Sequence, residues 1–106
     1  MQKIKESQIQ KTILDYLHLK GCVAFKHRNV GIFKQKTKQY IPLSFGEKGI
    51  SDIIGCTRDG RFIAIEVKRK GGRLSEEQKL FLQKIEKSGG IALVAYDLDL
   101  VIQRIP

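Results

Sequence analysis

The sequence predicts a mixed α/β fold in which a central β-sheet is flanked by helices. Apolar residues recur at helical spacing near the start of the chain and again after residue 74, and short runs of strand type lie between and after these stretches. Two of the runs are separated by Asp59-Gly60, a strong local signal for a β-hairpin. The 106 residues, 42% of them apolar, suit one domain (residues 1–106) with a core of moderate size.

The first helix is predicted from about Glu6 to Leu19. Ile9, Ile13 and Leu17 form one buried stripe, and Gly21 is a natural stop. Glu6 lies at the end of the same stripe and is therefore expected to face inward, where a carboxylate needs a partner because an unpaired buried charge is costly. The alternative is an ordinary first-turn acid, stabilised by the positive end of the helix dipole.

The next predicted strand covers residues 22–29. Apolar and basic side chains alternate there, which indicates a strand with one wet, basic side. Residues 34–38 are typical of an exposed hairpin or loop. Arg28 and Asn29 are suitable types for phosphate and sugar contacts, although both are also ordinary at the end of a strand.

The strand of Asp52 is predicted to pair antiparallel with the strand of residues 61–68 through the Asp59-Gly60 turn. Side chains alternate across a strand, so Glu66 and Lys68 share one face with Ala64, while the isoleucines and the valine of the run share the other. Two carboxylates from neighbouring strands, with a lysine beside them, make a plausible pocket for a hard divalent cation.

A β-α-β unit is predicted from Ile63 through the following helix to Ile91, with parallel strands and a right-handed crossover. Ser75 is the expected N-cap of its helix, and Gln78 completes a capping box. Gln78 can thus be explained entirely as a cap, but its place on the inward stripe allows a second role beside the carboxylates. Residues 91–96 are expected to form a buried central strand, and residues 97–106 a short helix or an edge strand.

The chain is strongly basic, with 20 Lys and Arg residues against 11 Asp and Glu and a net charge of +9. Residues 19–46 contain no acid, and a second basic cluster spans residues 68–73. Any single lysine can be a solvated surface charge, but two clusters on a small domain favour contact with nucleic acid. An anionic membrane is the rival partner, and the lack of a basic amphipathic helix with large apolar anchors argues against it. The candidate DNA-binding residues are Lys26, Arg28, Asn29, Lys34, Lys36, Lys38, Arg69, Lys70 and Arg73.

Cys22 and Cys56 lie far apart in apolar runs and form no C-x-x-C pair. We expect buried, reduced thiols and therefore a cytoplasmic location. No stretch approaches the length of a membrane span, and the histidines do not combine with the cysteines into a zinc pattern.

The order of these features resembles the PD-(D/E)xK nuclease superfamily and, within it, the virus-type replication-repair nuclease (VRR-NUC) domain. The resemblance extends from about residue 6 to residue 96 and implies a restriction-endonuclease-like core of αβββαβ order. One departure is Ser51, where the family usually has proline before the aspartate. The matching residues are Glu6, Gly49-Ile50-Ser51-Asp52, Glu66-Val67-Lys68 and Leu74-Ser75-Glu76-Glu77-Gln78.

The resemblance implies that Asp52 and Glu66 bind Mg²⁺ or Mn²⁺, with the Val67 main-chain carbonyl as a further ligand and Glu6 acting directly or through water. Lys68 would position the attacking water or stabilise charge developing on the phosphate. Gln78 would help to orient Lys68 or the substrate. A hard cation supplies both an activated water and Lewis-acid assistance, which phosphodiester hydrolysis requires.

The resemblance to stand-alone members of this family implies a homodimer that cuts branched DNA, four-way (Holliday) junctions in particular. The expected function is therefore a metal-dependent, structure-specific endodeoxyribonuclease whose partner is DNA, not a membrane or a small molecule. A nuclease of another DNA preference and a DNA-binding module without chemistry are the alternatives. A phage or mobile-element origin is suggested only by the habits of the family.

Overall fold

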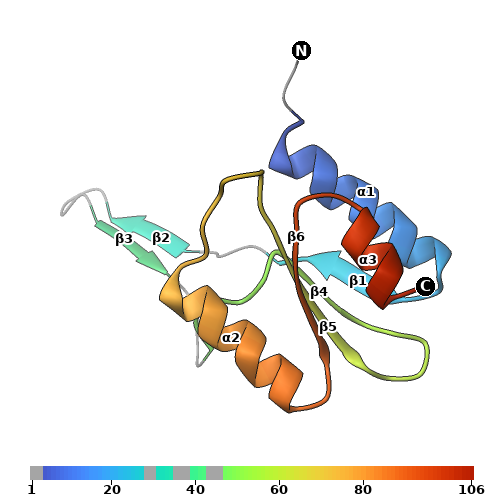
Figure 1. The fold of residues 1–106 in the computed structure, drawn as a ribbon. Coiled ribbons are helices and arrows are strands. Elements are labelled where there is room, and N and C mark those ends of the chain that lie inside the picture. Colours follow the sequence, from blue (N-terminus) through green and yellow to red (C-terminus); the bar gives the residue numbers. More distant parts are fainter. Residues whose placement is uncertain (1–3, 28–30, 35–38, 43–46) are drawn as a thin grey trace.

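The computed structural model describes residues 4–27, 31–34, 39–42 and 47–106, with the backbone alone for 31–34 and 39–42 (Figure 1). Three helices and six strands follow one another in these ranges. In chain order they are α1 (Glu6–Leu19), β1 (Val23–Lys26), β2 (Gly31–Lys34), β3 (Gln39–Pro42), β4 (Ile53–Cys56), β5 (Phe62–Val67), α2 (Glu76–Lys87), β6 (Ile91–Ala95) and α3 (Asp99–Arg104).

Four strands form a mixed sheet in the order β1-β4-β5-β6. β1 pairs antiparallel with β4, β4 pairs antiparallel with β5, and β6 runs parallel to β5. β2 and β3 make a separate antiparallel pair that is inserted between β1 and β4. Without this insertion and α3, the order is the predicted αβββαβ, and the fold is restriction-endonuclease-like.

The core has one layer on each face of the sheet. On one face, the buried stripe of α1 and two residues at the end of the chain, Val101 and Ile105, pack against the alternating residues Ile63, Ile65 and Val67 of β5. On the other face, a second cluster contains Ala64 with Phe81 and Leu82 of α2. The alternation predicted for β5 is confirmed, and it places Glu66 and Lys68 on the α2 side.

The strand of residues 91–96 was predicted to be central, and this is wrong. Within the part of the chain that the structure describes, β6 is an edge strand and β5 lies between two neighbours. β6 is nevertheless apolar because α2 covers one of its faces and α3 covers the other. The tail after residue 97 is a short helix, one of the two predicted alternatives, and it covers the α1 side of the sheet.

The turn between β4 and β5 forms where Asp59-Gly60 predicted it. Gly60 adopts φ +88°, a conformation that side-chain-bearing residues rarely take. Thr57 and Arg61 close the loop through their main chains, with Thr57 N donating to Arg61 O at 2.8 Å. The thiols of Cys22 and Cys56 are free, as expected, but only Cys22 is buried, while Cys56 is partly exposed. None of the helices described has the length and apolarity that a membrane crossing requires.

Candidate active site

Asp52 and Glu66 lie opposite each other on neighbouring strands. Ile53 pairs with Ile65 in the β4–β5 register, which brings Asp52, one residue before β4, level with Glu66. The Asp52 Oδ2 atom accepts a hydrogen bond of 2.8 Å from the main-chain N–H of Val67. The Asp52 carboxylate is therefore fixed at the end of β5 by a main-chain donor.

Glu66 is a buried acid, with only 2% of the residue exposed. Its Oε1 accepts a hydrogen bond of 3.1 Å from Gln78 Nε2 and lies 4.0 Å from Lys68 Nζ. Its Oε2 is buried without a hydrogen-bond partner among the residues that the structure describes. Burial first, and then the Asp52 carboxylate, raise the pKa of Glu66 to about 8, while the Lys68 ammonium opposes the shift.

The predicted capping box of α2 is present. Gln78 N donates to Ser75 Oγ at 3.1 Å, and Ser75 N donates to Gln78 Oε1 at 2.8 Å. The amide of Gln78 thus makes both of the contacts considered above. Its oxygen caps the helix, and its nitrogen donates a hydrogen bond to Glu66.

The structure brings Asp52, Glu66, Lys68 and Gln78 together but places Glu6 differently. Glu6 is half-buried, and its Oε1 accepts a hydrogen bond of 3.2 Å from the main-chain N–H of Arg69, just beyond β5. It approaches from the α1 side of the sheet, whereas Glu66 lies on the α2 side. Within the described ranges no three His, Cys, Asp or Glu side chains are gathered in a way that could hold a metal ion.

Two of the predicted ligands, Asp52 and Glu66, lie together and suit a hard divalent cation. Asp52 and Glu66 supply carboxylate oxygens, and the buried Glu66 Oε2 is left without any other partner in the described part of the chain. An added cation would compensate the charge that burial disfavours in Glu66. Glu6 and the Val67 carbonyl remain predictions as further ligands.

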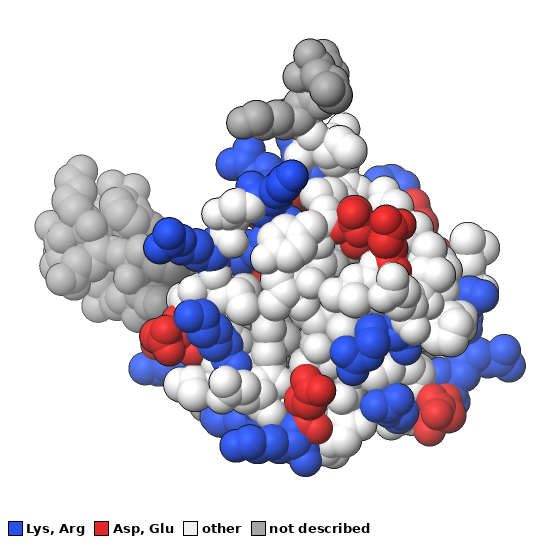
Figure 2. All heavy atoms as spheres, in the orientation of Figure 1, with Lys and Arg blue, Asp and Glu red and all other residues white. Residues whose placement is uncertain are grey.

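The predicted DNA-binding residues divide into two groups. Lys26, Arg69, Lys70 and Arg73 are exposed, and the last three follow the candidate site along the chain. Figure 2 shows Lys and Arg side chains in several separate groups, mostly toward the edge of one face of the molecule, with fewer acids among them. Arg28, Asn29, Lys36 and Lys38 lie outside the described residues, and Lys34 ends β2 with its side chain outside what is described.

Gly49 is a site residue whose role sequence reasoning missed. It adopts φ +71°, and a Cβ there would collide with the main chain of Glu77 and Gln78 at the start of α2. The segment leading to Asp52 can therefore lie directly against the helix that carries Gln78. The available signal was a glycine three residues before the aspartate.

The fold, together with the family match that follows, indicates a nuclease of the PD-(D/E)xK type, a class that generally uses divalent metals and binds DNA. The chain matches the VRR-NUC domain over residues 4–97, and it belongs to that family. No curated protein and no solved structure matches the chain.

Proposed function

We propose that this protein is a Mg²⁺- or Mn²⁺-dependent endodeoxyribonuclease that hydrolyses phosphodiester bonds in branched DNA, such as four-way junctions, and acts as a homodimer. The observation that carries the proposal is the convergence of Asp52, Glu66 and Lys68 on the α2 side of the sheet, with a buried Glu66 oxygen that no described residue satisfies.

The cation would be held by Asp52 and Glu66, with the Val67 carbonyl and Glu6 as further ligands. When bound, it would activate a water and act as a Lewis acid toward the phosphate. The chain's own groups have distinct tasks. Lys68 places a positive charge near the carboxylates, where it can orient the water or stabilise charge developing on the phosphate.

Two contacts hold the acids in place. The Val67 N–H donates a hydrogen bond to Asp52. The side-chain amide of Gln78, which also takes part in the capping box of α2, donates a hydrogen bond to Glu66. Because both donors belong to regular elements of the fold, the carboxylates are oriented before substrate arrives. Lys26, Arg69, Lys70 and Arg73 are exposed and would contact DNA phosphates.

The preference for branched DNA rests on the way in which a nuclease domain of this kind can recognise its substrate. None of the three helices that the structure describes is patterned to enter a major groove, so we expect contacts to phosphates and to DNA shape. A two-fold dimer suits a four-way junction because the junction must be nicked symmetrically in two strands. Sedimentation that gave only a 12.1 kDa monomer, with and without junction DNA, would contradict the dimer.

The test is a cleavage panel. The protein is incubated with linear duplex, single strand, flap and four-way junction DNA, each with Mg²⁺, with Mn²⁺ and with EDTA. Symmetric nicks at the junction that require the metal would support the proposal. Scattered products would indicate a nuclease of other preference, and band shifts without any cutting would indicate a DNA-binding module.

A further inference from the structure

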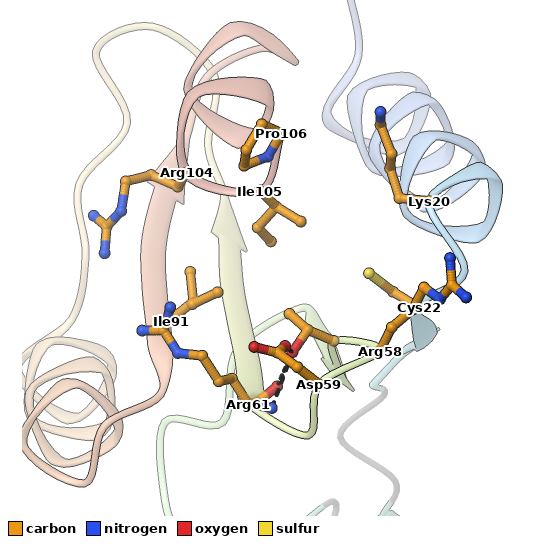
Figure 3. Close-up of a pocket in the computed structure, with 10 residues that line it drawn as sticks. Lys20, Cys22, Arg58, Asp59, Arg61, Ile91, Arg104, Ile105 and Pro106 are labelled. Carbon is orange, nitrogen blue, oxygen red and sulfur yellow. Dashed lines mark hydrogen bonds between the residues drawn. The ribbon is translucent and has the colours of Figure 1, made fainter.

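A cationic pocket lies at the other end of β5 from the candidate active site (Figure 3). Its volume is about 280 Å³, and four basic side chains line it, those of Lys20, Arg58, Arg61 and Arg104. Asp59 is the single acidic side chain among the described residues that line it. The proposed phosphodiester chemistry uses none of these five residues.

Three of the four cations have side-chain contacts in the described part of the chain, and none of these contacts is with an anionic group. Lys20 follows α1, and its Nζ lies 5.7 Å from the centroid of the Tyr16 ring. The stem of Arg58 crosses Gly21, where an added Cβ would lie 2.7 Å from Arg58 Cδ. The side-chain Nε of Arg61 donates a hydrogen bond of 3.3 Å to the carbonyl of Gly89.

The pocket keeps an excess of positive charge. Among the described residues, none of the four cations forms a salt bridge. Asp59 accepts a hydrogen bond from the Thr57 hydroxyl and so is engaged within its own turn (Figure 3). Like charges around one hollow repel each other, and an anion that enters it would relieve the repulsion.

The pocket and the candidate active site are well separated. Arg61 and Glu66 are five residues apart on the same extended segment, a span of about 17 Å. The pocket includes Ile91 and Ile105 of the α1-side core, whereas Glu66 and Gln78 lie on the α2 side. Phosphates directly beside the scissile bond therefore cannot occupy this pocket.

We propose that the pocket of Lys20, Arg58, Arg61 and Arg104 binds phosphate groups of a second DNA segment, one that is not being cut. The proposal rests on the nuclease function above, since a branched substrate offers duplex arms in more than one direction. Several cations placed around one hollow can each meet a phosphate of a DNA backbone.

The experiment measures binding of uncut junction DNA in EDTA by fluorescence anisotropy, over a series of salt concentrations. The triple variant K20Q/R58Q/R104Q is compared with K11Q/K84Q/K87Q, which removes the same charge from exposed positions on α1 and α2. We expect the pocket variant to bind at least about tenfold more weakly and to lose about two to three from the slope of log K against log salt. The control variant should change far less.

Equal losses in the two triple variants would overturn the proposal, because net charge alone would then account for them. The single changes Arg58→Lys and Arg58→Glu provide a second measurement if the triple variant unfolds. The first should retain binding, the second should lose it, and equal binding by both would contradict the pocket.

A parallel titration uses inorganic phosphate and a deoxynucleoside monophosphate, followed by NMR shifts of the pocket amides. Saturation by the mononucleotide at micromolar concentration, with an unchanged salt slope for DNA, would assign the pocket to a free nucleotide and overturn its assignment to DNA. The nuclease proposal is tested by a different measurement, cutting in Mg²⁺. Absence of cutting would contradict that proposal without changing the binding results obtained in EDTA.

Discussion

The side-chain amide of Gln78 connects the buried carboxylate of Glu66 to the first turn of α2. Its nitrogen donates to Glu66 Oε1 at 3.1 Å, while its oxygen accepts from the main-chain N–H of Ser75 at 2.8 Å. The capping bond determines which end of the amide faces the site. The side chain that caps the start of α2 therefore also donates a hydrogen bond to Glu66.

Substitutions of Gln78 should separate these two tasks. Gln78→Glu keeps an acceptor for the capping box but replaces the donor to Glu66 by another carboxylate. Cutting should fall at least about tenfold, as expected when a positioning contact to a catalytic group is lost. Gln78→Ala should also weaken the cap, by about 0.5–1 kcal/mol of unfolding free energy.

The measurements are urea denaturation and the rate of junction cutting. Gln83→Ala, the counterpart of Gln78→Ala at an exposed position of α2, serves as the control. Normal cutting by Gln78→Glu would show that the bond to Glu66 has no part in the activity.

Asp52→Asn, Glu66→Gln and Lys68→Ala should each abolish cutting. The first two remove charge from the proposed metal ligands, and the third removes the cation that lies 4.0 Å from Glu66 Oε1. DNA affinity should stay within about threefold of wild type, because few of the phosphate contacts are lost. Cleavage and anisotropy assays test this, with Lys79→Ala on the exposed side of α2 as the control. If Lys68→Ala cut DNA normally, the proposed mechanism would be wrong.

The parts of the fold that were predicted correctly depend on local patterns. Period-two alternation in residues 62–68 places Glu66 and Lys68 beside Ala64, and the Asp59-Gly60 turn pairs their strand with that of Asp52. The capping box at Ser75 is likewise local. Each depends on residues within a few positions of one another, which is the range over which sequence patterns are informative.

The features that were not predicted depend on packing between distant segments. The apolar run of β6 is equally consistent with a central strand and with an edge strand covered on both faces by helices. Glu6 was expected to face the core, but its contact with the Arg69 main chain depends on how α1 crosses the end of β5. The cationic pocket gathers residues from the end of α1, where Lys20 follows the helix, from the β4–β5 turn and from α3, and no spacing in the sequence connects them.

Glu66 should make the stability of the metal-free protein depend on pH. Its pKa is raised from 4.5 to about 8 in the folded protein, so the folded state holds the proton more tightly than the unfolded chain does. The resulting stabilisation is complete below pH 4.5 and is lost as the pH rises to about 8. Within that window the contribution falls by up to about 1.4 kcal/mol per pH unit.

Glu66→Gln isolates this effect, because glutamine is neutral at every pH and similar in shape. In EDTA, the variant should be more stable than wild type above neutral pH, and the difference should shrink toward pH 4.5, as measured by urea denaturation. Added Mg²⁺ should raise the Tm of wild type more than that of the variant. Parallel pH profiles for the two proteins would show that Glu66 titrates normally in the folded state.

Gly49→Ala should damage the site through the backbone. Gly49 and Gly60 both have positive φ, +71° and +88°, so alanine strains the chain at either position. Only at Gly49 would the new Cβ strike the main chain of α2, at Glu77 and Gln78, while at Gly60 it would find nothing within 4 Å. Gly60→Ala should therefore cost about 1 kcal/mol, and Gly49→Ala should cost more, about 2–4 kcal/mol, and also slow cutting by moving Gln78 away from Glu66. Urea denaturation and cleavage of the two variants, made in parallel, separate backbone strain from the steric clash. Equal losses of stability in both variants would mean that the segment before Asp52 does not pack against α2 as closely as the structure shows.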